Sequence, residues 1–552
     1  MLKRIRIVPV AIPIVLMGII LIIGFIVPEQ FTTIMTDFFI ALMENAGWMV
    51  SIGVLIFVGC MVLLFVHPFG SIKFGGKDAL PKYKTWIWWA ISLCAGIGTG
   101  IVFWGATEPL MHTFTPPPSV GLEPGSLDAV IWGMSKSFLH WSFSPYSIYA
   151  VAGITIGYAY YNMNKSYTAS AGLVYLNDGK ELNSKINTII DGIILFAICG
   201  GVAGSLGYGL LQIGSGLNFV FGIEPGPFVW AIIAAVIITS YTISSATGLD
   251  RGIAWLSDKN AWIFIALMIF VLVCGPTAYI FNLFTQSFGY FVNNFVDLSL
   301  FTQPIVDSDL WPQWWDMYWM VDWLSFGPIV GLFLVKLSYG RTIREFITVN
   351  VILPAMFGIL WFSIFGGLAL DLQLRGVADM SGFLADNGAQ AFMMYIFEFL
   401  PFTELIRIIM LVTIGLSFIT LADSMTSTIS TMSLKQSKGV KEAPLPIKVF
   451  WGVFIGLISL VFVISGGIDG IKIVKTIAGF PILFIELAMI LGFLYHLFSG
   501  KLKRDELEYA DFMDGEVATA AAEAEAELAD THIHKKWYTL EKQKDNKKDK
   551  KE

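Results

Sequence analysis

The sequence predicts an all-α polytopic membrane protein with twelve transmembrane helices. Of its 552 residues, 56% are hydrophobic and only 14% are charged, whereas soluble domains carry roughly 45–50% apolar and about 25% charged residues. Apolar stretches long enough to cross about 30 Å of hydrocarbon recur along the chain. This composition excludes a water-soluble globule and intrinsic disorder. No basic stripe with interleaved aromatic residues precedes the C-terminal tail, which argues against nucleic acid as a partner.

The predicted spans follow one another from the N-terminus to about residue 498. They lie near residues 8–28, 47–66, 86–111, 128–161, 187–221, 228–248, 260–285, 316–338, 350–370, 403–432, 447–465 and 473–498. The first is longer than a signal-peptide core, and no small-residue cleavage site follows it, so we interpret it as a retained helix. Two further apolar-rich stretches, 288–301 and 388–400, fit interfacial or extracellular segments better than spans.

Positive charges predict the orientation. Nineteen Lys and Arg residues lie in the N-terminus and the even-numbered connections, whereas the opposite side offers Arg375, Lys472 and Lys475. Because cytoplasmic loops carry the excess of Lys and Arg, we expect both termini on the cytoplasmic side of the cytoplasmic (inner) membrane.

Glycines interrupt the third predicted helix. Gly96, Gly98 and Gly100 alternate, which does not match the three- or four-residue spacing of a helix-packing face. They favour a locally unwound segment that lines a cavity, as discontinuous helices of transporters do, although close helix packing is the alternative. The eighth helix has a similar predicted break at residues 325–328. Helices three and eight are five apart, which inverts their orientation and predicts two inverted five-helix repeats around a central site.

This reasoning divides the chain into five segments. Residues 1–85 form two N-terminal helices and a cytoplasmic loop, 86–285 the first five-helix repeat, 286–315 an extracellular or interfacial segment, 316–499 the second repeat, and 500–552 a charged cytoplasmic tail. The tail is acidic and alanine-rich and then lysine-rich. It fits a solvated, disordered end or a regulatory arm that senses anionic lipid or ionic strength.

Aromatic residues are concentrated in helices four and eight. Trp319 and Trp323 share a helical face at i, i+4 spacing; Trp141 and Tyr149 are eight residues apart, and Tyr146 is three residues from Tyr149. Tryptophan and tyrosine often form the interfacial belt. An inward-facing aromatic box instead binds a quaternary ammonium by cation–π interactions, worth about 2 kcal/mol or more when desolvated.

Asp322 lies deep in the eighth predicted helix, where a carboxylate is costly and functional by default. Its partner could be a substrate cation, a proton or a helix end. The substrate-binding candidates are therefore Trp141, Tyr146, Tyr149, Trp319, Asp322, Trp323, Phe326, Gly96, Gly98 and Gly100. The four cysteines and six histidines show no metal-binding or catalytic spacing, so we expect no enzyme, no catalytic residue and no cofactor.

Several motifs resemble the betaine/choline/carnitine transporter (BCCT) family. They are the glycine run leading into residues 103–109, His140-Trp141 with Pro145 and Tyr149, the connection at 248–260, residues 339–346 and residues 422–424. The resemblance extends from the first helix to about residue 500. It implies a LeuT-like fold with two extra N-terminal helices, a homotrimer, and transport of trimethylammonium compounds.

In sodium-coupled members, the resemblance places one sodium ion between helices three and ten. The matching positions here are Cys94 and Ile97 through backbone carbonyls, with Ser417, Thr420 and Leu421. Leu421 and Val202 stand where those members have hydroxyl residues, so sodium dependence is not supported, and coupling to Na⁺, to H⁺ or to neither stays open. Tyr146 and Asp322 replace aromatic positions of the family box, which could favour choline or an amine that keeps an N–H donor.

The sequence thus predicts a secondary active transporter that moves a quaternary or methylated amine of the betaine, choline or carnitine type by alternating access. An amine/amine exchanger that no ion gradient drives is the nearest alternative. A channel would need a filter or a ring of like charges, and an intramembrane enzyme would need a nucleophile with a base or a metal site; neither pattern is evident.

Overall fold

The structure is a computed structural model that describes residues 5–97, 100–247, 252–304, 309–435 and 443–502. Within these ranges the named elements are all helices, and the strand-like pairings are two isolated bridges, Ile5–Leu434 and Lys73–Thr342. The predicted all-α class is confirmed. The part of the C-terminal tail beyond residue 502 lies outside the described residues.

Nine segments of the described chain are long and apolar enough to cross a membrane, and each overlaps a predicted span, although the second begins at Thr33 rather than at residue 47. They lie in α2 (Pro28–Val66), α8 (Ser184–Phe221), α9 (Pro227–Thr247), α10 (Ala254–Cys274), α13 (Tyr318–Leu337), α15 (Leu353–Leu374), α18 (Thr403–Met432) and α19 (Leu445–Phe498), the last of which holds two of them. The chain is therefore a multi-pass membrane protein.

The three remaining predicted spans have a different form. The first is α1 (Ile7–Ile26), with a shorter apolar core. The third comprises α3 (Thr85–Ile97), α4 (Gly100–Trp104) and α5 (Thr107–Phe114), with a turn at residues 105–106 between α4 and α5. The fourth is divided into α6 (Leu127–Trp141) and α7 (Phe143–Gly157), with non-helical backbone at Ser142 (φ −127°, ψ −119°). The discontinuity predicted at Gly96, Gly98 and Gly100 stays a prediction, because residues 98–99 lie outside the described residues.

The predicted break in the eighth helix is wrong. Helix α13 continues from Tyr318 to Leu337 through Pro328, which membrane helices tolerate because neighbouring groups can satisfy the freed carbonyl. Gly327 serves packing instead, since a Cβ atom there would collide with the Glu486 carboxylate of α19.

Two boundaries also differ from the prediction. The seventh span ends at Cys274, just before Pro276, and α11 (Thr277–Asn293) crosses the expected repeat boundary at residue 286. Helical backbone continues through residues 465–473, where a turn between the last two spans was expected. The shorter elements are η2 (Pro68–Ser71), η3 (Pro118–Val120), η4 (Tyr158–Asn162), η5 (Ala169–Asn177), α12 (Phe295–Ser299), η7 (Gln313–Met317), α14 (Ile343–Ile347), η8 (Thr348–Ile352), α16 (Met380–Asn387), α17 (Ala389–Ile396) and η9 (Phe397–Phe399).

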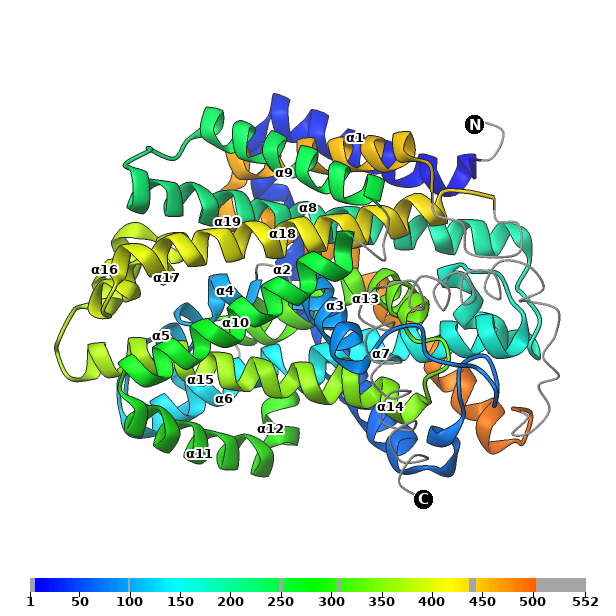
Figure 1. Cartoon of the computed structure of the whole chain (residues 1–552), viewed down its shortest axis with the longest axis horizontal. Coiled ribbons are helices and arrows are strands. Elements are labelled where there is room, and N and C mark those ends of the chain that lie inside the picture. Colours follow the sequence, from blue (N-terminus) through cyan, green and yellow to red (C-terminus); the bar gives the residue numbers. More distant parts are fainter. Residues whose placement is uncertain (1–4, 98–99, 248–251, 305–308, 436–442, 503–552) are drawn as a thin grey trace, which may run out of the picture. The chain divides into compact units, whose positions relative to one another are not determined.

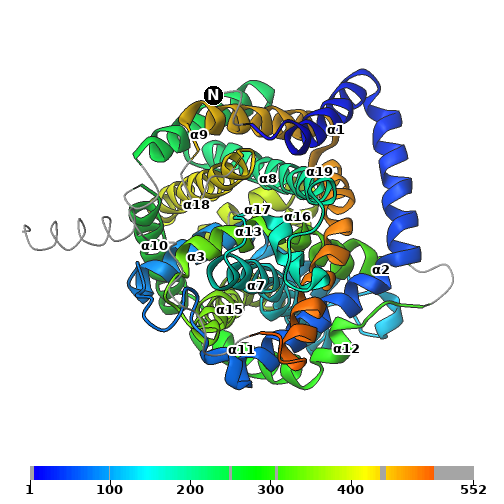
Figure 2. The same ribbon diagram turned by 90° about the vertical axis from the view of Figure 1, so that its right-hand side faces the viewer.

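Helix α13 is the central element (Figure 1). In the span Gln313–Leu337, 94% of an apolar 18-residue stretch is buried. The corresponding stretch of α9, which lies at the periphery, is only 28% buried. Figure 2 shows α13, α7 and α3 surrounded by α8, α18, α10, α15 and α19. Helix α13 packs against α7, α8 and α19, so its polar and aromatic side chains face protein rather than lipid.

Candidate functional site

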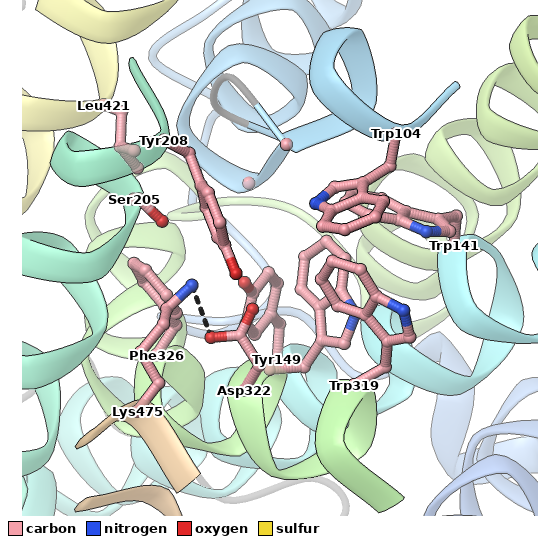
Figure 3. Close-up of a pocket in the computed structure, with 13 residues that line it drawn as sticks. Trp104, Trp141, Tyr149, Ser205, Tyr208, Trp319, Asp322, Phe326, Leu421 and Lys475 are labelled. Carbon is pink, nitrogen blue, oxygen red and sulfur yellow. Dashed lines mark ion pairs between the residues drawn. The ribbon is translucent and has the colours of Figure 1, made fainter. Parts of the chain in front are cut away.

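A pocket lies where the broken helices meet α13 (Figure 3). The space between its side chains, open solvent included, is about 390 Å³. The lining residues come from the third and fourth spans and from α8, α13, α18 and α19. They are Gly96, Gly100, Trp104, Trp141, Tyr149, Ser205, Tyr208, Trp319, Asp322, Trp323, Phe326, Leu421 and Lys475.

Tryptophan and tyrosine rings form one wall of this pocket. The Trp141 ring lies edge-on to Trp319 and Trp323, with centroid distances of 4.7 and 5.3 Å, and Tyr149 lies 5.6 Å from Trp323. Trp104 extends the wall, 5.4 Å from Trp319. These four tryptophans and Tyr149 are called the aromatic cage below.

Hydrogen bonds fix the two inner rings of the cage. Trp141 Nε1–H donates to Glu108 Oε2 at 2.7 Å, and Trp323 Nε1–H donates to the carbonyl oxygen of His140 at 3.0 Å. Because both indole N–H groups have partners, the orientations of these two rings are fixed. The interruption at Ser142, directly after Trp141, lets α6 and α7 approach the site separately.

Gly100 makes room for the cage. A Cβ atom at this position would lie 2.7 Å from Cη2 of Trp141, closer than carbon atoms can approach. The absence of a side chain therefore lets the start of α4 lie against the Trp141 ring, which is a packing reason for one of the predicted glycines.

The opposite wall carries an ion pair. Lys475 Nζ of α19 lies 2.6 Å from Asp322 Oδ1 of α13, and both side chains are buried (Figure 3). Lys475 and Lys472, which the count of positive charges assigns to the external side, are only 2% and 7% exposed within α19. Asp322 thus has a fixed protein partner, and the pair brings no net charge to the pocket.

The sequence analysis named most of the lining residues. Of the ten substrate-binding candidates, the pocket includes Trp141, Tyr149, Trp319, Asp322, Trp323, Phe326, Gly96 and Gly100. Tyr146 is not among the lining residues; its ring packs 6.1 Å from that of Trp323. Trp104, Ser205, Tyr208 and Lys475 were not predicted as site residues. A lysine inside an apolar helix is the signal that could have pointed to Lys475.

The candidate sodium residues make other bonds. Cys94 and Ile97 belong to α3, and Ser417 and Thr420 belong to α18. Asn260 Nδ2 donates to Ser417 Oγ at 2.8 Å, while the Thr420 hydroxyl donates to two carbonyl oxygens of its own helix. A hard cation requires about six oxygen ligands. The two carbonyls and two hydroxyls supply four oxygens and the Leu421 side chain supplies none, so the set falls short of that number.

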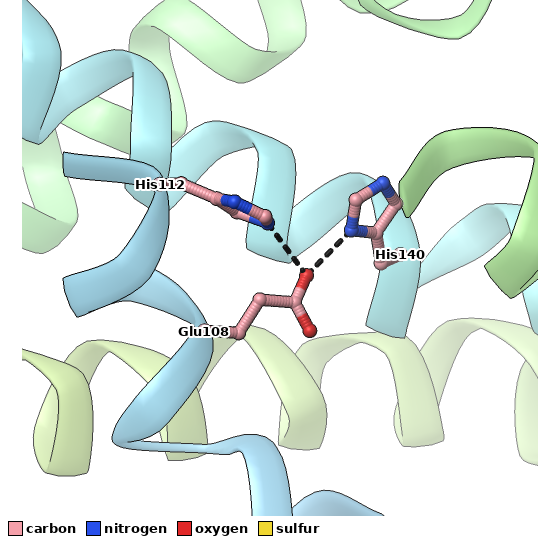
Figure 4. A group of neighbouring side chains, drawn as sticks. All are labelled: Glu108, His112 and His140. Carbon is pink, nitrogen blue, oxygen red and sulfur yellow. Dashed lines mark hydrogen bonds and ion pairs between the residues drawn. The ribbon is translucent and has the colours of Figure 1, made fainter. Parts of the chain in front are cut away.

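Glu108, His112 and His140 are close enough together to suggest a metal site (Figure 4). However, Glu108 Oε1 lies 2.5 Å from His140 Nδ1 and 3.2 Å from His112 Nε2. Two ligands of a tetrahedral metal at 2.0–2.1 Å are about 3.3 Å apart. The Glu108–His140 contact is therefore a hydrogen bond, and the arrangement does not fit a coordinated metal.

Discontinuous helices around an aromatic pocket, inside a multi-pass membrane protein, define a membrane transporter. A family model described as "BCCT, betaine/carnitine/choline family transporter" matches residues 8–501. The chain belongs to this family, as its motifs indicated, and it is consequently a transport protein and not an enzyme.

Curated relatives match nearly the whole chain. An ectoine/hydroxyectoine transporter of Virgibacillus pantothenticus is 32% identical, covering 88% of this chain and 96% of the relative. The glycine betaine transporter OpuD of Bacillus subtilis (strain 168) is also 32% identical, covering 89% and 94%. Among solved structures, a Na⁺-coupled sialic acid symporter in a substrate-bound outward-open state matches 79% of this chain and 86% of its own, with 13% identity and a TM-score of 0.45.

Proposed function

We propose that this protein is a secondary active transporter of a small zwitterion with a methylated-ammonium or amidinium group, such as glycine betaine or ectoine. The solute binds in the pocket between the aromatic cage and the Asp322–Lys475 pair. The observation that carries this proposal is the juxtaposition of the cage with a charge-neutral ion pair in one small buried space.

The aromatic cage supplies the site for the cation. A quaternary ammonium has no N–H to donate, so it binds to the negative faces of aromatic rings, at about 2 kcal/mol or more per desolvated contact. Trp141, Trp319, Trp323 and Tyr149 offer such faces within one wall.

The ion pair selects for a zwitterion over a pure cation. An unpaired Asp322 would favour choline, as the sequence suggested, but Lys475 at 2.6 Å compensates its charge. A choline molecule would leave an uncompensated charge in this buried space, which is costly. A zwitterion brings no net charge: its carboxylate can accept from Lys475, while an N–H of an amidinium can donate to Asp322. The names of the relatives, a glycine betaine transporter and an ectoine/hydroxyectoine transporter, agree with this class.

The architecture is proposed to be twelve spans, with α1 and the divided third and fourth segments added to the nine continuous ones. Helices three to seven and eight to twelve then form two inverted repeats in a LeuT-like arrangement, with both termini in the cytoplasm and the chain in the inner membrane as a homotrimer. Alternating access results when one repeat rocks against the other around the pocket.

Uptake by purified protein in liposomes tests the function. Radiolabelled glycine betaine, ectoine, choline and carnitine are offered separately, with empty liposomes as control and with ion and pH gradients imposed in turn. We expect a zwitterion to accumulate in the liposomes in a saturable manner, and we expect an imposed gradient to drive this accumulation. Accumulation only against a preloaded amine would identify an exchanger, and the absence of saturation would identify a channel; either would contradict the proposal.

A further inference from the structure

A buried chain of polar side chains runs away from the aromatic cage between α5, α6 and η7. It consists of Glu108, His112, Lys136, His140 and Asp316, all of them buried, and is called the His140 network below. His140 Nδ1 lies 2.5 Å from Glu108 Oε1, and His140 Nε2 lies 2.6 Å from Asp316 Oδ1. Asp316 Oδ2 also lies 2.6 Å from Lys136 Nζ.

The geometry requires an extra proton in this network. A neutral imidazole carries one N–H, and its other nitrogen presents a lone pair. Both nitrogens of His140 face carboxylate oxygens at hydrogen-bond distance, and a lone pair cannot face another lone pair there. Either His140 is an imidazolium or one of the two carboxyl groups is protonated. Both cases place one additional proton on Glu108, His140 and Asp316. The reference is the state in which the imidazole is neutral and both carboxyl groups are ionised.

The charges of the network's own five side chains balance only when this proton is present. His112 Nε2 lies 3.2 Å from Glu108 Oε1, and its Nδ1 has no hydrogen-bond partner among the described residues, as expected for a neutral ring that donates from Nε2. Lys136 and an imidazolium then offset the two carboxylates. Loss of the proton would leave one uncompensated negative charge in a buried place, which is costly.

The proton is connected to the pocket through the two inner cage rings. Glu108 accepts the Trp141 N–H, and the His140 carbonyl accepts the Trp323 N–H. If the proton left, a carboxylate and the bare nitrogen of His140 would repel each other, and the groups that hold both tryptophans would shift. Proton binding therefore stabilises the arrangement of the cage.

We propose that the His140 network is the binding site of a co-transported proton, taken from water on one side of the membrane with the solute and released to water on the other. This inference rests on the proposed function. By linkage, each ligand strengthens the binding of the other by the same factor. Solute affinity then increases as pH falls, and solute binding takes up protons.

Other charged groups lie near the His140 network or the pocket and bear on the expected pH dependence. Lys472 packs on the Trp315 ring, which contacts His112, and it adds a positive charge beside the network. The Asp322–Lys475 pair lies across the pocket and is neutral. Glu486 is a buried carboxyl whose oxygens have no hydrogen-bond partner among the described residues. No cation is paired with Glu486 in the described part of the chain, so its proton would stay in place.

The test measures the affinity of the purified protein for glycine betaine and for ectoine between about pH 5 and about pH 9, by calorimetry. The dissociation constant is expected to rise with pH over part of this range, with a limiting slope of about tenfold per pH unit for one linked proton. In weakly buffered solution, adding solute should take up as much as about one proton per molecule bound.

Glu108→Gln is the matched variant. The amide oxygen can accept from Trp141, and the two amide hydrogens can donate to His140 Nδ1 and His112 Nε2, while His140 Nε2–H donates to Asp316. Trp141, His140 and Asp316 keep hydrogen-bond partners, and the network is neutral without the extra proton. His112 then carries its hydrogen on Nδ1, which has no partner among the described residues. The variant should therefore fold, bind solute with an affinity independent of pH, and take up no proton. Glu486→Gln makes the same chemical change elsewhere and should keep the wild-type slope.

Solute binding by the wild type with the same affinity at every pH would overturn this inference and leave the proposed function standing. A slope that survives in Glu108→Gln, or disappears in Glu486→Gln, would also overturn it. Stoichiometric metal in the purified protein, lost with Glu108→Gln, would instead identify the cluster as a metal site.

Discussion

Asp322 and Lys475 form a buried ion pair across the pocket, with 2.6 Å between Oδ1 and Nζ. They come from α13 and α19, helices whose pocket residues are about 150 positions apart in the sequence. The pair changes the expected preference of the site from cations to zwitterions, because each charge of the protein already has a partner before the solute arrives. It also links these two helices at the pocket.

Removing one partner of this pair should destabilise the protein. Asp322→Asn leaves the Lys475 ammonium buried and uncompensated, at an expected cost of about 3–5 kcal/mol. The double variant Asp322→Asn with Lys475→Gln has no buried charge and should recover most of the lost thermal stability. Asp178→Asn, which breaks an exposed pair with Lys501, should change stability little. If Asp322→Asn, Asp178→Asn and the wild type all had the same melting temperature, the Asp322–Lys475 pairing would be contradicted.

Trp323→Leu should weaken the binding of glycine betaine at least about tenfold, equivalent to about 1.4 kcal/mol. The change removes a ring that contacts Trp141 and Tyr149 and deletes the hydrogen bond to the His140 carbonyl. Calorimetry on detergent-purified protein measures the effect, and size-exclusion chromatography checks the fold. Trp255→Leu, on the exposed surface of α10, is the control. Unchanged affinity in a folded Trp323→Leu protein would remove this ring from the site.

Gly100→Ala should also weaken binding, because the added methyl group would lie 2.7 Å from the Trp141 ring and displace it. Gly415→Ala on α18 has no neighbouring atom within 4 Å of the added Cβ and provides the control for a glycine-to-alanine change in a helix. An affinity loss of about tenfold or more is expected for the first variant. Wild-type affinity in Gly100→Ala would show that Trp141 can move without affecting the ligand.

Sodium should not be required for binding or uptake. The Ser417 hydroxyl accepts from Asn260, the Thr420 hydroxyl donates within its own helix, and Leu421 offers no oxygen. Replacing sodium by potassium at constant ionic strength should leave solute affinity and the uptake rate unchanged. Strong sodium stimulation that potassium cannot reproduce would be the contrary result, and would imply a sodium site built from other oxygens.

Local sequence patterns predicted features that depend on one helix. The composition predicted the helical membrane class, and i, i+4 spacing predicted that Trp319 and Trp323 share one face. The break expected at Gly327 and Pro328 was wrong, because a glycine that permits contact with Glu486 has the same sequence appearance as one that ends a helix.

Contacts between distant helices could not be predicted in the same way. The sequence places Lys475 near the outer end of the last predicted span, and its pairing with Asp322 is known only from the packing of α13 on α19. The His140 network is a similar case. Glu108, His140 and Asp316 belong to three separate elements, and the sequence does not reveal that both nitrogens of one imidazole face carboxylates.

The central claim is that a charge-neutral pocket with an aromatic cage selects a zwitterion. The most direct measurement is the dissociation constant of the wild-type protein for glycine betaine and for choline, by calorimetry under identical conditions. These molecules share the trimethylammonium group and differ in whether a carboxylate is present. The account predicts that glycine betaine binds at least about tenfold more tightly, and that the difference shrinks or reverses in Lys475→Gln, where Asp322 is unpaired. Equal affinities in the wild type, or tighter binding of choline, would contradict it.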